Sequence, residues 1–86
     1  MLNRDAEPVA WTQFMYELED AYEHLGNLIA LLTSGQQIDD THFAVDLGHV
    51  YAHLNRAWHS KNESNRISDE NWPKYTEFPT DVRPVG

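Results

Sequence analysis

Cysteine is absent from the 86-residue chain, which excludes a disulfide framework and a cysteine-based zinc site. Long apolar runs are also absent. The longest, Leu28 to Leu32, is far shorter than the roughly 20 residues that a membrane-spanning helix needs. The first ten residues carry charges and a proline in place of the apolar stretch of a secretory signal. We therefore expect a cytoplasmic protein that does not bind membranes.

Positive charge is scarce and unevenly placed. The chain has 14 acidic and 6 basic residues, a net charge of −8, and no Lys or Arg lies between Asp5 and Asn55. Such a field repels nucleic acid and attracts cations or a basic protein. The hydrophobic share of 41% is nevertheless too high for a disordered chain. The composition therefore indicates a folded acidic protein that does not bind nucleic acid and has a basic protein as a candidate partner.

An apolar seam predicts a first helix from about residue 8 to residue 34. Pro8 suits its first turn and Gly35 suits its end. The seam positions alternate spacings of four and three, as on the buried side of a bundle helix. We expect the opposite, polar side of this helix, which includes Glu17 and His24, to be solvated. Phe14 and Leu28 widen the seam into the broader stripe of a bundle helix, and the seam itself consists of Trp11, Met15, Leu18, Tyr22, Leu25, Ile29 and Leu32.

A second helix is predicted from about residue 40 to residue 60. Asp39, Asp40 and Thr41 are each suited to cap its N-terminus. The short polar connection between the two predicted helices implies an antiparallel hairpin. The same spacing of four and three recurs in this helix at Phe43, Leu47, Val50, Leu54 and Ala57.

The remaining third of the chain is more polar and contains Pro73, Pro79 and Pro84, which prevent a long helix. We predict a short helical turn at about 69–76 and an extended tail at 77–86, within a single all-α domain of residues 1–86. Two helices cannot enclose a core by themselves. Either the tail folds back as a third layer, or two chains pair into a dimeric four-helix bundle. The length of the first seam favours the homodimer.

The sharpest candidate for chemistry is a stripe of ionisable residues on the second helix. His49 and His53 have the i, i+4 spacing that directs two imidazoles into one coordination sphere. Asp46 lies one turn earlier and His42 one heptad before His49. These four residues form a candidate divalent-metal site for zinc, iron or nickel. The favoured interpretation is that they are hydrogen-bonded boundary residues with no bound cofactor. A proton sensor that titrates in mild acid is a further alternative.

A second candidate surface combines the end of the second helix with the aromatic tail. Aromatic and arginine side chains are the usual anchors of protein interfaces. In a domain this small the same aromatics could instead close the core of their own chain. The predicted partner-binding residues are Arg56, Trp58, Trp72, Tyr75 and Phe78.

No catalytic motif is present in the sequence, which lacks a nucleophile elbow and a glycine-rich phosphate loop. The leading interpretation is a non-enzymatic protein-interaction module that acts as a homodimer. The first alternative is a metal-binding helical bundle centred on the Asp/His/His cluster. The second is an acidic decoy that occupies the basic surface of a nucleic-acid-binding protein.

Overall fold

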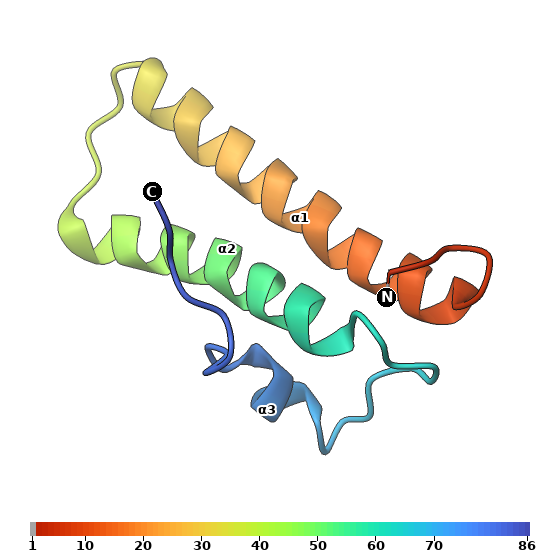
Figure 1. Ribbon diagram of the computed structural model, residues 1–86. Coiled ribbons are helices and arrows are strands. Elements are labelled where there is room, and N and C mark those ends of the chain that lie inside the picture. Colours follow the sequence, from red (N-terminus) through yellow and green to blue (C-terminus); the bar gives the residue numbers. More distant parts are fainter. Residues whose placement is uncertain (1) are drawn as a thin grey trace.

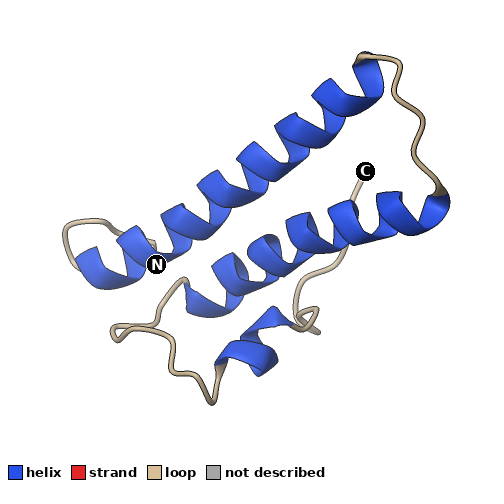
Figure 2. Cartoon of the chain, turned by 180° about the vertical axis from the view of Figure 1, so that it is seen from behind, coloured by secondary structure: helices blue, strands red, loops and turns tan. Residues whose placement is uncertain are grey.

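The computed structural model describes residues 2–86, so of the predicted domain only Met1 lies outside it. It contains α1 (Pro8–Thr33), α2 (Asp40–Ser60) and α3 (Trp72–Thr76), and the described residues form no strand (Figure 2). α1 and α2 form an antiparallel hairpin, and α3 lies on the side of α2 that faces away from α1 (Figure 1). The predicted all-α hairpin is confirmed. α3 begins at residue 72, three residues after the predicted start of the helical turn.

Local sequence signals account for the ends of the two long helices. Pro8 occupies the first turn of α1, where its missing N–H would have no helical partner. After α1 the chain turns at Gly35, whose φ of 83° is a left-handed conformation that glycine adopts readily. Asp39 precedes α2, and its Oδ1 accepts a 2.8 Å hydrogen bond from the backbone N–H of His42. Of the three predicted caps of α2, the structure therefore selects Asp39.

The surface by which α1 contacts α2 differs from the predicted one. The buried apolar residues of α1 are Ala10, Phe14, Ala21 and Leu28. Phe14 and Leu28 belong to the predicted stripe, but the buried seam lies one residue earlier than the predicted seam. One residue corresponds to 100° around a helix, so the predicted seam was assigned to the wrong side of the hairpin. Small alanines allow the helices to approach closely. The large side chains of the predicted seam are left pointing to one flank.

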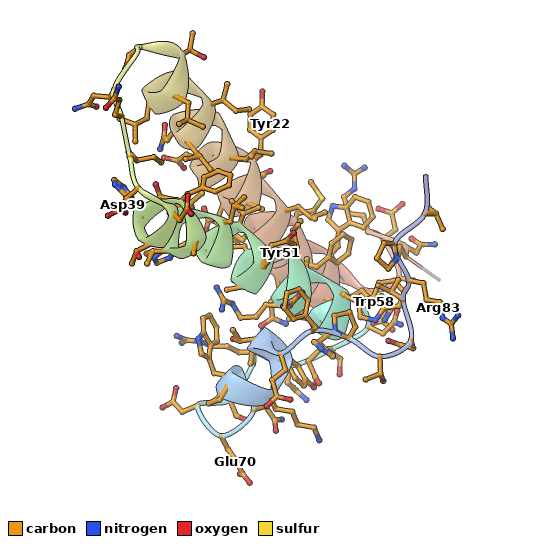
Figure 3. The ribbon with its side chains drawn as sticks, turned by 90° about the vertical axis from the view of Figure 1, so that its left-hand side faces the viewer. Tyr22, Asp39, Tyr51, Trp58, Glu70 and Arg83 are labelled. Carbon is orange, nitrogen blue, oxygen red and sulfur yellow. The ribbon has the colours of Figure 1, made fainter. Side chains whose placement is uncertain are left out.

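That flank is exposed to solvent along most of its length. On α1, Leu18, Leu25 and Ile29 are exposed, and Tyr22 keeps 82% of its surface accessible. Figure 3 shows that Tyr22 points away from α2. On α2, Phe43, Tyr51 and Leu54 are also exposed. We call these residues, together with Leu32, the apolar face of the hairpin.

The C-terminal tail folds back, but it covers only part of α2. Residues 77–86 cross in front of α2 in Figure 1 and end near the gap between the two long helices. The Phe78 ring packs edge-on against Tyr51, with ring centroids 5.2 Å apart. The indole N–H of Trp58 donates to Asp81 at 2.9 Å. The tail therefore forms a partial third layer and leaves the α1 part of the apolar face uncovered.

We predict that Asp39→Ala lowers the free energy of unfolding by about 0.5–2 kcal/mol, because it removes the side-chain acceptor for the first turn of α2. Urea denaturation measures the loss. Asp40→Ala is the matched control, since it removes the same charge at the next position without removing the cap. Equal losses in the two variants would show that charge, and not capping, controls this helix end.

Candidate functional site

A buried ionic cluster lies between α1 and α2. Glu17 of α1 is only 8% exposed, and its Oε2 accepts a 2.9 Å hydrogen bond from the Nε of Arg56 on α2. The same Oε2 lies 3.2 Å from the Nδ1 of His53. Arg56 is 7% exposed, and its Nη2 lies 3.2 Å from that same Nδ1. The three side chains therefore form one connected polar network between the two long helices.

Histidines extend this network along the hairpin interface. The ring of His24 on α1 stacks on His53, with centroids 5.0 Å apart, and on His49, with centroids 5.6 Å apart. Two members of the predicted stripe of α2, His49 and His53, therefore face α1. The predicted solvation of the polar side of α1 is wrong for Glu17, which finds its basic partner on α2 and is buried there.

The remaining members of the stripe lie nearer the hairpin connection. His42 Nε2 is 3.2 Å from Asp46 Oδ2, an i, i+4 pair at the surface. Within residues 2–86, no group of three or more His, Asp or Glu side chains is arranged to hold a metal ion. His42 and Asp46 pair with each other, while His49 and His53 stack on His24. The predicted metal site stays a hypothesis, for which elemental analysis of the purified chain is the test.

The predicted partner-binding residues form several contacts within the chain. The guanidinium of Arg56 lies 4.4 Å from the ring centroid of Trp72, and its Nη1 donates to Thr76 Oγ1 at 2.9 Å. Arg56 therefore contacts residues of α3 in its own chain. Trp58 packs under Lys61, whose Nζ is 3.7 Å from the ring centroid. Trp72 and Phe78 remain exposed, and Tyr75 is half-buried.

Glu17 and His24 are the central site residues that the sequence reasoning did not place in the hairpin interface. A signal for both exists in the sequence. They are seven residues apart and belong to a second seam with the same alternating spacing, which mixes apolar and polar residues. A charged residue on a seam needs a buried partner, and Arg56 is the first basic residue after the long base-free stretch. That second seam consists of Ala10, Phe14, Glu17, Ala21, His24, Leu28 and Leu31.

The fold and the cluster define a small all-α hairpin held by a buried ion pair between its two long helices. Compared with known protein families, curated proteins and solved structures, the chain gives no match. No helix within residues 2–86 has the length and apolar character needed to cross a membrane.

We predict that Arg56→Leu destabilises the chain by about 3–5 kcal/mol, because it leaves the Glu17 carboxylate buried without its basic partner. The double variant Glu17→Leu/Arg56→Leu removes both charges and should recover most of that loss. Urea denaturation of both variants measures the difference. A double variant that is less stable than Arg56→Leu would show that the ion pair itself is not the main contribution.

Among the predicted partner-binding residues, Tyr75 is a titratable group whose surroundings shift its pKa. Its hydroxyl donates a 3.0 Å hydrogen bond to Glu63 Oε2. This bond, together with desolvation and the carboxylate charge, raises the pKa of Tyr75 above its ordinary value of 10.0. The folded pKa is therefore higher than the unfolded pKa. The stability contributed by this bond is fully present below pH 10.0 and is lost as the pH rises through the folded pKa.

We predict that the stability difference between the natural chain and Tyr75→Phe is constant in neutral solution and shrinks as the pH rises above 10.0. Urea denaturation at a series of alkaline pH values measures it. The phenylalanine variant cannot ionise, so it also reports any general alkaline loss. A stability difference that grows with pH would contradict the raised pKa.

Proposed function

We infer that the protein is a non-enzymatic protein-interaction module that acts as a homodimer. The observation that carries this proposal is the amount of surface that a single chain leaves exposed. A compact monomer of 10.0 kDa exposes about 5,200 Å². This chain exposes 6706 Å². The chain is also more extended than a compact monomer, because its radius of gyration is 14.7 Å and a compact domain of this length has about 12 Å.

The excess surface has the size of a protein interface. It is roughly 1,500 Å² per chain, whereas each partner in a standard interface contributes about 800 Å². Large, apolar contacts of this kind are typical of permanent homodimers. A second copy of the chain is therefore large enough to bury the apolar face.

The residues of the apolar face lie on the same flank of both helices. On α1 the exposed seam follows the buried seam by one residue. On α2, the exposed Tyr51 follows the buried Val50, and Leu54 follows His53, so the offset is again one residue. A step of one residue turns a side chain by 100° around its helix. Because the two right-handed helices run in opposite directions and face each other, this step moves the side chains of both helices to the same flank of the pair. The two stripes therefore form one continuous surface.

The spacing along this surface favours another helical pair as its cover. The seven positions from Trp11 to Leu32 alternate four and three, which is the repeat of knobs-into-holes packing. Two hairpins that pack through this face form a four-helix bundle, with the buried ion pair inside each hairpin and apolar contacts between them. The tail occupies the C-terminal half of α2 at the border of this interface.

The acidic composition indicates the chemistry of a further partner. Six carboxylates and no Lys or Arg lie between Leu18 and Val50, so this part of the surface attracts positive charge. The proposed module therefore presents an apolar face to its own copy and an acidic surface to a basic protein.

We predict that Ile29→Lys shifts the protein from dimer to monomer, because it buries an unpaired charge in the proposed interface. Sedimentation equilibrium should give twice the chain mass of 10.0 kDa for the natural protein and the single mass for the variant. Asn27→Lys is the matched control. Asn27 is exposed and lies about 160° around α1 from Ile29, so the same charge change should leave the dimer intact. If both variants were monomeric, the change in net charge, and not burial of a charge in the interface, would explain the dissociation.

A further inference from the structure

Residues 78–86 of the tail, which we call the strap, cross α2 (Figure 1) and are loosely packed against it. A hollow of about 620 Å³ lies between the strap and α2. Tyr51 and Leu54, two members of the apolar face, line this hollow and stay 47% and 41% exposed. A well-packed interior leaves few voids larger than a water molecule, so the strap crosses these side chains without burying them. The strap lines the hollow with Phe78, Pro79, Val82, Arg83 and Pro84.

Two hydrogen bonds fix the chain at the point where the strap begins. Asn55 Nδ2 of α2 donates to the carbonyl oxygen of Thr76 at 2.8 Å. His59 Nε2, also on α2, lies 3.1 Å from the carbonyl oxygen of Glu77. The backbone at Glu77 is extended, so the strap leaves α3 directly from this fixed point. A movement of the strap therefore leaves the docking of α3 on α2 in place.

The strap itself has only weak contacts with α2. Phe78 packs edge-on against Tyr51, yet Phe78 keeps 66% of its surface exposed. The indole N–H of Trp58 donates to Asp81 at the surface. Within residues 2–86, Asp81 is the last residue of the chain that forms a hydrogen bond, and residues 82–86 are all exposed. Release of the strap therefore breaks one surface hydrogen bond and one partly exposed ring contact.

The strap and a second copy of the chain compete for the same side chains. A second hairpin that covers the whole apolar face must contact Tyr51 and Leu54, where the strap now lies. The strap keeps another helix away from these two residues and leaves over two-fifths of their surface in water. Knobs-into-holes packing buries such side chains more completely. The gain in buried apolar surface therefore favours the second copy over the strap.

We propose that the strap is displaced when two hairpins pair, and that it thereby limits self-association. This inference rests on the homodimer proposed above and adds a means of regulating it. In a single chain the strap lies over the α2 part of the apolar face, and in the pair both straps are released from residue 78 onward. A contact that holds the strap on α2 weakens the pairing, and loss of that contact strengthens it.

The first test compares dissociation constants of full-length variants by sedimentation equilibrium. Asp81→Ala removes the acceptor of the Trp58 hydrogen bond and should tighten the dimer about five- to twenty-fivefold, because each pairing releases two straps. Glu77→Ala is the matched control. It removes the same charge next to the strap, from a side chain that forms no hydrogen bond within residues 2–86, and should change the constant less than about twofold. A natural dimer that neither variant tightens, or that both tighten equally, would overturn the strap.

The second test follows the strap itself by nuclear magnetic resonance. The heteronuclear NOE of the backbone amides of Thr80, Asp81 and Val82 reports their order. We expect low values in the natural dimer, where the strap is released, and higher values in the monomeric variant Ile29→Lys, where it lies on α2. Equal order in the two proteins would overturn the strap and leave the homodimer standing.

The two proposals can also fail in the opposite way. A natural chain that is monomeric, with an Asp81→Ala variant that is dimeric, would support the strap and overturn the homodimer as the state of the natural chain. Monomers in both cases would overturn both proposals, because no pairing would exist for the strap to limit.

Discussion

The ion pair between Glu17 and Arg56 is the contact on which the rest of the structure depends. A carboxylate and a guanidinium taken out of water are stable only when they meet, and these two can meet only in one relative position of α1 and α2. Arg56 also reaches Thr76 and lies over Trp72, so one side chain connects all three helices. The pair therefore sets both the register of the hairpin and the docking of α3.

The ion pair between Glu17 and Arg56 also determines which side chains of α1 are exposed to solvent. Because the polar seam of α1 packs against α2, the more apolar seam is turned toward solvent. The buried apolar side chains within one chain are few and mostly small, which is a weak core for a domain of this size. The tail adds contacts to α2 at Tyr51 and Trp58, whereas Tyr22 and Ile29 of α1 stay exposed. In the proposed homodimer, a second chain covers this remaining surface.

Periodicity and capping residues predicted the helices and the hairpin, because these depend on neighbours a few positions apart. The side by which α1 packs could not be predicted in the same way. Two seams with the same spacing overlap on this helix, and hydrophobicity alone favours the one that begins at Trp11. The ion pair between Glu17 and Arg56 selects the other, and it links residues 39 positions apart. The histidine stack and the contact of Tyr51 with Phe78 are likewise non-local.

Small-angle X-ray scattering of the natural chain distinguishes the proposed homodimer from a monomer, because it gives mass and shape in one measurement. We expect a particle of twice the chain mass of 10.0 kDa at all working concentrations, with a radius of gyration above the 14.7 Å of a single chain. A particle with the mass of one chain and a radius of gyration of 14.7 Å or less would rule out the homodimer. In that case the apolar face would be stable in water without a second copy.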